Sequence, residues 1–251
     1  MGSNFNARVK EYIDLDGLTH YLLSRRNPDG GFCFYGLDES GLFDTYHAML
    51  ILEAIGRIPD DGKTVEYLQR FQSNDGRFTS PYTATYVMKA LSAIGETLLC
   101  DPGDYVRNIS RSCRIPDTVY IESASIFESV AIVIDLCTML DMDEPCREIA
   151  DKVASHVRED GSYGGNDPSL VSTYYAVRIL KAGRKALQDP LQTAGWVKSH
   201  AIPSGGFAKK PYTGMAFMDE TYYAPKYVRP FEAFMTDTNT IVECKLIIWR
   251  G

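Results

Sequence analysis

The chain has 251 residues, of which 45% are hydrophobic and 24% are charged. These values are ordinary for a globular protein, and they exclude a disordered chain, a fibre and a disulfide-rich mini-protein. The formal net charge of −7 provides no broad basic surface, so a nucleic-acid partner is excluded as well.

The most apolar stretch, residues 125–140, is interrupted by Glu128 and Asp135, and the N-terminus has no apolar signal region. We therefore expect no transmembrane segment. Six cysteines are scattered without Cys-x-x-Cys spacing. In a chain of this length, that pattern favours reduced thiols and a cytoplasmic location.

A turn with an Asp-Gly pair and a following aromatic residue recurs along the chain. Full copies lie at 29–32, 75–78 and 160–163, and a weaker copy lies at 204–207. The glycines are 46, 85 and 44 residues apart. Because the middle interval is nearly twice the others, a degenerate copy is predicted at 114–120. Five units with a period in the mid-forties indicate a repeat architecture.

Each unit begins with an amphipathic helix that ends at the glycine turn, as at 17–26 and 64–71. A second, more apolar helix follows after a loop of variable length. These second helices are predicted at 45–55, 84–94, 124–140 and 173–180. Alternation of half-exposed and buried helices predicts an all-α fold, an α/α toroid (barrel) of about five to six helical hairpins with an inner and an outer layer. We expect one toroid domain over residues 1–251.

The glycine turns, the phrase at 171–180 and the parallel phrase at 82–91 resemble a known repeat. This is the squalene oxidase repeat, shared by protein prenyltransferase β subunits and squalene-type terpene cyclases. The resemblance spans nearly the whole chain. It implies an α/α toroid whose central apolar cavity holds an isoprenoid or an isoprenoid diphosphate.

The first turns of the second helices should gather on one rim of the inner ring, which is the natural mouth of a cavity. They are the segments 44–47, 83–86, 122–125, 172–174 and 236–239. Most of their Asp, Ser and Thr residues are interpreted first as helix caps. Tyr46, Tyr86 and Tyr174 are candidate substrate-binding residues that line a tunnel for the isoprenoid chain. The alternative is that these tyrosines fill the core with their hydroxyls hydrogen-bonded.

A candidate metal site combines Cys33, Asp44 and His47, because a thiolate, a carboxylate and an imidazole suit zinc. Zinc would leave one position for a substrate thiolate. The resemblance implies that prenyltransferase ligands come from an Asp-x-Cys phrase in one unit and a His in another. Here Asp219 has Thr221 in the position of that Cys, which weakens the zinc hypothesis. The alternative is a capping Asp44 and a hydrogen-bonded rim His47.

Asp44, His47 and Asp219 are the candidate catalytic residues. Lys209 and Lys210, after the last glycine turn, resemble the basic residues that bind diphosphate in this family, although such a pair is often solvated surface. The Asp-x-Asp-Asp acid of proton-initiated cyclases is absent from the sequence. This absence favours a prenyltransferase over a cyclase.

Residues 211–234 form an aromatic-rich insertion, which we interpret as ring closure combined with a lid or partner surface. Three functions remain open. The first is a prenyltransferase-like enzyme, the second a non-catalytic toroid that binds a protein, peptide or lipid, and the third a subunit of a heterodimer with a helical partner. A terpene cyclase-like enzyme without the Asp-x-Asp-Asp acid is a further alternative.

Overall fold

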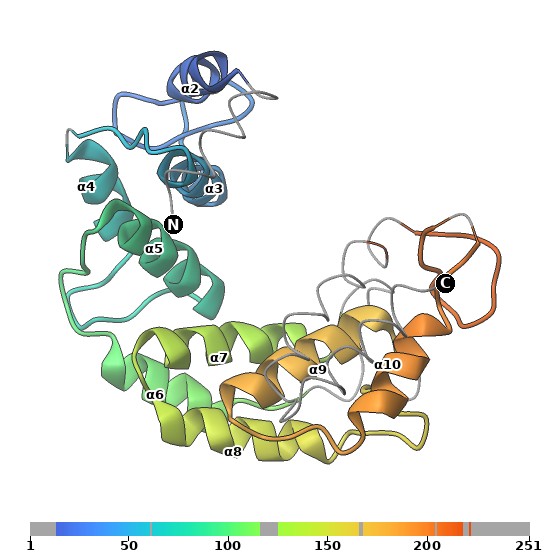
Figure 1. Ribbon diagram of the computed structural model, residues 1–251. Coiled ribbons are helices and arrows are strands. Elements are labelled where there is room, and N and C mark those ends of the chain that lie inside the picture. The colour runs from blue at the N-terminus through green and yellow to red at the C-terminus, as the bar shows by residue number, and fades with distance from the viewer. Residues whose placement is uncertain are drawn as a thin grey trace. The chain divides into compact units, whose positions relative to one another are not determined.

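The computed structural model describes residues 14–60, 62–115, 125–165, 168–203, 205–217 and 221. These residues contain nine α-helices and, apart from isolated β-bridges, no β-structure. The predicted all-α class is therefore confirmed. The chain divides into two compact units, Met1–Tyr105 and Val106–Gly251, shown in Figure 1. Of the described helices, none combines the length and the apolar character that a membrane crossing requires.

First and second helices of the repeats alternate along the chain. The first helices are α2 (Leu15–Leu23), α4 (Lys63–Gln69), α6 (Gly103–Ser112), α8 (Asp143–Ala154) and α10 (Pro190–Lys198). The second helices are α3 (Leu42–Ala54), α5 (Pro81–Ile94), α7 (Glu128–Met139) and α9 (Leu170–Ala182). The division between the two units falls within α6.

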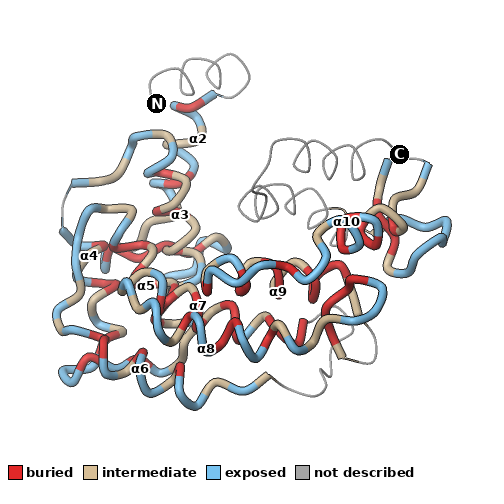
Figure 2. Tube along the Cα trace, turned by 60° about the horizontal axis from the view of Figure 1, so that its bottom comes forward, coloured by how far each residue is buried: buried red, intermediate tan, exposed pale blue. Residues whose placement is uncertain are grey.

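Each unit has its own core. In the first unit, α5 packs against α3 and α4. In the second unit, α7, α8 and α9 pack against one another, and buried residues recur along all three in Figure 2. Helix α9 alone buries eight residues, which agrees with the prediction that second helices are the more buried ones. The prediction of a single domain stays a prediction.

Helices α3, α5 and α9 each begin three residues before their predicted starts. The actual N-cap residues are Gly41, Ser80 and Ser169, and both serine side chains accept a backbone hydrogen bond. The interpretation of 44–47, 83–86 and 172–174 as caps was therefore wrong, because these residues lie inside the helices.

Helix α7 begins later than predicted, at Glu128. The Ser125 side chain accepts a hydrogen bond from the Phe127 N–H at 3.0 Å, which holds residues 125–127 in a turn.

In three of the glycine turns, a hydrogen bond links the turn to the helix that follows it. The backbone N–H of the turn's aromatic residue donates to a threonine hydroxyl near the start of that helix. The pairs are Phe32 with Thr45 at 2.9 Å, Tyr163 with Thr173 at 3.1 Å, and Phe207 with Thr221 at 3.0 Å. The Thr45 and Thr173 residues are fully buried, so these bonds satisfy backbone donors inside the core.

The third pair bears on the predicted insertion at 211–234. Thr221 makes the bond that Thr45 and Thr173 make in other units, and it lies 14 residues after Phe207, against 13 for the first pair. The predicted start of the last second helix at 236–239 lies outside the described residues and stays a prediction. Residues 218–220 and 222–251 lie outside the described part of the chain. The extent of the insertion stays a prediction.

The same turns also form hydrogen bonds with the first helix of the following repeat. The Thr64 hydroxyl donates to the Gly30 carbonyl, and the Thr193 hydroxyl donates to the Gly161 carbonyl, both at 2.8 Å. In the second repeat, the Gln72 side chain binds both the N–H and the carbonyl of Cys100. The first and third of these turns therefore bind the next helix through a backbone carbonyl, whereas the contact in the second repeat is made by the Gln72 side chain.

Gly161 should tolerate no side chain. Its φ is +81°, and a Cβ atom would lie 2.7 Å from the backbone nitrogen of Thr193. We expect Gly161→Ala to lower the free energy of unfolding by roughly 1–3 kcal/mol. Gly195→Ala in α10 is the matched control, because nothing lies within 4 Å of its Cβ position. The control should be neutral or stabilising by about 0.5–1 kcal/mol. Urea unfolding measures both changes, and equal effects would contradict this account.

His200 lies two residues after the end of α10 and is buried. It is 1% exposed, and its Nδ1 donates to the Trp196 carbonyl at 3.0 Å. Its Nε2 is buried with no hydrogen-bond partner among the described residues. Burial lowers the pKa of His200, although the bond to Trp196 and the charge of Asp160 oppose that shift.

The lowered pKa of His200 predicts acid sensitivity. Its contribution to stability is fully present above the unfolded-state pKa of about 6.5 and is lost as the pH falls through the folded-state value. Between about pH 7.5 and about pH 5, His200→Asn should unfold with a flatter pH dependence than the wild type. The difference in slope should not exceed about 1.4 kcal/mol per pH unit. His20→Asn, at an exposed position on α2, should keep the wild-type profile. An unchanged profile for His200→Asn would refute the prediction.

Candidate functional site

Aromatic side chains gather where α3 and α5 begin. The rings of Tyr46 and Tyr86 stack with centroids 5.0 Å apart and an interplanar angle of 27°. Phe43 meets Tyr86 edge-on at 5.6 Å. The ring of His47 lies 4.1 Å from Phe43 and 4.7 Å from Tyr46. We call Phe43, Tyr46, His47 and Tyr86 the aromatic cluster.

The local sequence explains why the aromatic cluster reaches solvent. Thr45 and Thr85 are buried, and each is followed by a tyrosine. Because successive helix residues differ by about 100° in direction, Tyr46 and Tyr86 point away from the core. Both tyrosines are half-buried, and Phe43 is 56% exposed. The two tyrosines are therefore not in the fully buried core, and their role as substrate-binding residues stays a prediction.

The two polar candidates on α3 make local hydrogen bonds. Asp44 Oδ2 accepts the Phe34 N–H at 3.1 Å, so this carboxylate holds the loop before α3. His47 Nδ1 lies 2.8 Å from the Phe43 carbonyl oxygen and donates to it. Because Nδ1 carries the proton in that bond, the lone pair of the neutral His47 ring is on Nε2.

The predicted zinc ligands differ in how far they are buried. Cys33 is buried, whereas Asp44 and His47 are half-buried. Within the described ranges, no three His, Cys, Asp or Glu side chains come close enough to hold a metal. Zinc binding by Cys33, Asp44 and His47 therefore stays a prediction, and we derive no chemistry from it.

Tyr174 in the second unit lies in a different environment. Its ring is 5.5 Å from that of Tyr175, and the Arg178 guanidinium lies within 6 Å of both ring centroids. Arg178 also donates to Asp135 of α7 at 2.7 Å. The two charged side chains are 33% and 17% exposed. We call these four residues the ionic cluster.

The two basic candidates also lie in the second unit. Lys209 is half-buried, and its Nζ lies 4.9 Å from the centroid of the Phe217 ring. Lys210 is exposed. Lys210 is therefore the more accessible of the two for an anionic ligand. Asp219 lies outside the described residues, as do residues 122–124 of the predicted rim.

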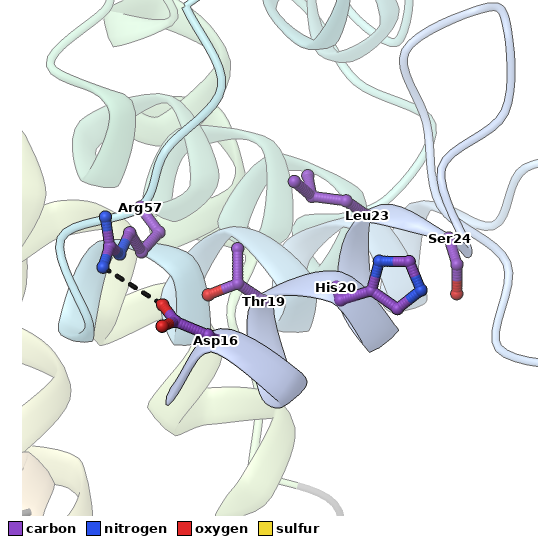
Figure 3. A pocket seen from close by; sticks show the side chains of 6 residues that line it. All are labelled: Asp16, Thr19, His20, Leu23, Ser24 and Arg57. Atoms are coloured by element: carbon purple, nitrogen blue, oxygen red, sulfur yellow. Dashed lines mark hydrogen bonds and ion pairs between the residues drawn. The ribbon is translucent and has the colours of Figure 1, made fainter. Parts of the chain in front are cut away.

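A shallow surface pocket of about 490 Å³ lies elsewhere in the first unit, along one face of α2 (Figure 3). Arg57 and Asp16 form an ion pair across it at 3.3 Å. The remaining lining residues are Thr19, His20, Leu23 and Ser24. The pocket contains none of the residues that the sequence analysis selected.

Three residues of these clusters were not predicted from the sequence as functional residues: Phe43, Asp135 and Arg178. A signal for the ionic pair was present, because Asp135 and Arg178 each interrupt an apolar helix. They are also 43 residues apart, which is close to one repeat period. No comparable feature of the sequence marked Phe43 as a functional residue.

Two comparisons with known proteins agree with this structure. The sequence matches the family described as "Prenyltransferase alpha-alpha toroid domain" over residues 7–97 and 126–229. It is also similar to a drimenyl diphosphate synthase from Streptomyces showdoensis, with 26% identity over 219 residues. That match covers 76% of this chain and 40% of the relative, so the chain spans well under half of the relative's length. Because the family match includes most of the sequence, the chain belongs to the prenyltransferase alpha-alpha toroid family.

Proposed function

We propose that this chain binds an isoprenoid diphosphate and that the hydrocarbon portion lies against the aromatic cluster. The observation that carries the proposal is the aromatic surface that exposed Phe43 and half-buried Tyr46 and Tyr86 form on two neighbouring second helices. Family membership supports an isoprenoid-related function. The name of the similar protein, a drimenyl diphosphate synthase, also supports a diphosphate ligand.

The aromatic rings suit two features of such a ligand. They offer apolar surface, whose removal from water contributes about 25 cal/mol per Å². Their faces also attract positive charge. When diphosphate leaves an allylic carbon, positive charge develops on the remaining prenyl group, and a nearby ring face stabilises that charge.

The proposed reaction is prenyl transfer. The bond between the prenyl carbon and the diphosphate oxygen breaks, and diphosphate leaves with the electron pair. An acceptor then forms a bond to the prenyl carbon and loses its proton. His47 is the proposed proton acceptor because its Nε2 carries the lone pair. Asp44 positions the loop before α3, and Asp219 stays a candidate catalytic residue.

Lys209 and Lys210, which lie in the second unit, stay candidate diphosphate ligands. Lysine ammonium groups are common phosphate binders and act as point charges. The exposed Lys210 should contribute more than Lys209, which already lies against the Phe217 ring. A helical protein partner and a cytoplasmic location also remain proposals.

A second candidate function is terpene cyclisation, which the similarity to a drimenyl diphosphate synthase favours. The missing Asp-x-Asp-Asp acid argues against a cyclase whose chemistry is complete within this chain. Product analysis after incubation with farnesyl diphosphate separates the candidates. Prenyl transfer requires an acceptor and releases diphosphate, whereas cyclisation changes the hydrocarbon without an acceptor.

The first test is thermal unfolding with farnesyl or geranylgeranyl diphosphate, each with and without zinc. A ligand at 100 times its dissociation constant adds about 2.7 kcal/mol, which corresponds to roughly 5–10 °C for a chain of this size. A shift with the prenyl diphosphates but not with inorganic diphosphate would support hydrocarbon binding. If the folded protein shows no shift with either lipid, the proposal is wrong and the non-catalytic module becomes the better explanation.

Tyr86→Leu tests the aromatic cluster. Leucine keeps an apolar side chain but removes the ring stacked on Tyr46, and aromatic pairs contribute about 0.5–1.5 kcal/mol. We expect the dissociation constant for farnesyl diphosphate to rise about twofold to tenfold. Tyr35→Leu, at an 85% exposed loop position, is the control and should bind like the wild type. Equal affinities for all three proteins would exclude this surface.

Lys210→Ala tests the diphosphate ligand. Loss of a charge-assisted contact at an exposed position should weaken farnesyl diphosphate binding by about tenfold at low salt and by less at high salt. Affinity for farnesol, which lacks the charged group, should not change. Lys152→Ala, an exposed substitution on α8, controls for the loss of one positive charge. Identical effects of the two substitutions would point to a general charge effect.

A further inference from the structure

The half-exposed side of α9 is made by three residues of the ionic cluster. Between residues 171 and 180, every side chain is buried except those of Tyr174, Tyr175 and Arg178. The two residues next to Arg178 in the sequence are completely buried, so its backbone is fixed in the core. A molecule that approaches this side of the helix must therefore meet the Arg178 guanidinium and the two tyrosine rings.

The ionic cluster holds the Arg178 guanidinium from two helices. Its Nη2 donates to Asp135 Oδ1 of α7 at 2.7 Å. Its Cζ lies 5.7 Å from the centroid of the Tyr174 ring and 5.8 Å from that of the Tyr175 ring. Both tyrosines lie one helical turn before Arg178, on the same side of α9. Such contacts restrain a side chain before a ligand arrives, which lowers the entropy cost of binding.

Arg178 has hydrogen-bond donors that Asp135 does not use. Among the described residues, Asp135 is its hydrogen-bond partner, and Nη2 is the nitrogen involved. A guanidinium also carries N–H groups on Nε and Nη1. The Arg178 side chain is 33% exposed. Arg25 differs, because its Nε is buried with no hydrogen-bond partner in the described part of the chain. The remaining N–H groups of Arg178 are therefore accessible to a molecule in solvent.

We propose that Arg178 is the centre of an oxyanion-binding site on the half-exposed side of α9, where it binds a carboxylate or phosphate group of a ligand. The planar fork of a guanidinium matches two oxygens of such a group and donates two parallel hydrogen bonds to them. Asp135 holds the guanidinium and does not contact the ligand. The site lies in the second unit, and it does not depend on hydrocarbon binding by the aromatic cluster of the first unit.

The negative charge of Asp135 weakens this site but does not cancel it. A ligand oxygen bonded to Arg178 lies within hydrogen-bonding distance of the positive charge, whereas the guanidinium separates it from the Asp135 carboxylate. Because Coulomb energy falls with distance, the attraction exceeds the repulsion. The Asp135 side chain is also less exposed than that of Arg178, at 17%. We therefore expect weak binding, with a dissociation constant in the millimolar range.

The experiment follows the isotope-labelled full chain by nuclear magnetic resonance. Sodium acetate and sodium phosphate are added separately at constant pH, with sodium chloride at equal ionic strength as the reference. The Nε–H signal of Arg178 and the amide signals of Val177 and Ile179 should shift along a saturable curve. A response to acetate alone would support a carboxylate site, to phosphate alone a phosphate site, and to both a general oxyanion site. Shifts no larger than those with chloride would overturn the proposal.

Arg178→Lys tests the guanidinium fork. Lysine keeps the positive charge, but its ammonium group cannot donate two parallel bonds in one plane. Followed by the amide signals of Val177 and Ile179, the affinity for the responding oxyanion should fall about tenfold. Arg147→Lys on α8 is the matched control, because Arg147 is 59% exposed and pairs with Asp143 at 3.4 Å. The control should bind like the wild type.

Far-ultraviolet circular dichroism identifies a variant that fails to fold. If Arg178→Lys does not fold, Arg178→Gln takes its place, because glutamine can still donate a hydrogen bond to Asp135. Wild-type affinity in a folded Arg178 variant would overturn the proposal.

Asp135→Asn separates a ligand site from a structural ion pair. Asparagine still accepts the hydrogen bond from Arg178, but it removes the opposing negative charge. The affinity for the oxyanion should therefore rise, by about twofold to tenfold at low salt. If the pair is only structural, the substitution lowers the stability of the protein and leaves the oxyanion titration unchanged. An unchanged titration in folded Asp135→Asn would contradict binding at Arg178.

Discussion

The hydrogen bond from the aromatic turn residue to a threonine hydroxyl, present in three of the repeats, is the interaction on which those repeats depend. Its donor is a backbone N–H close to the core, and such a donor destabilises the fold if it has no partner. Only a hydroxyl at one position of the following helix supplies that partner. Phe32 with Thr45 and Tyr163 with Thr173 show the same solution in the two units. The bond thus fixes how each second helix is rotated relative to its turn.

That rotation also determines which residues can contact a ligand. Because the threonine points into the core, the tyrosine that follows it must lie on the half-exposed side. The Thr-Tyr pair occurs at 45–46, 85–86, 173–174 and 221–222. The turn bond therefore accounts for the position of Tyr46 in the aromatic cluster and of Tyr174 in the ionic cluster. The hydrogen bond that stabilises the repeat therefore also sets the direction of the candidate binding tyrosines.

The repeat could be predicted from sequence because its signals are local. Glycine turns at a regular interval and apolar helices between them gave the all-α toroid and most helix positions. The helix starts were misplaced because Thr45 and Thr173 resemble caps, and only the tertiary bond to the turn shows their role. The pairing of Asp135 with Arg178 was missed for a similar reason, since it joins two helices 43 residues apart. Contacts of that kind depend on packing, which a single sequence does not contain.

The two units offer chemically different half-exposed surfaces on their second helices. In the first unit the aromatic cluster is largely apolar, whereas in the second Asp135 and Arg178 lie beside two tyrosines. Removing that ion pair from water costs free energy, which the attraction between the charges offsets only in part. A ligand group that covers the ionic cluster must therefore form the hydrogen bonds that water otherwise forms with Asp135 and Arg178. A hydrocarbon chain cannot form them. This difference favours the aromatic cluster as the surface for the apolar chain and the ionic cluster as a surface for polar groups or solvent.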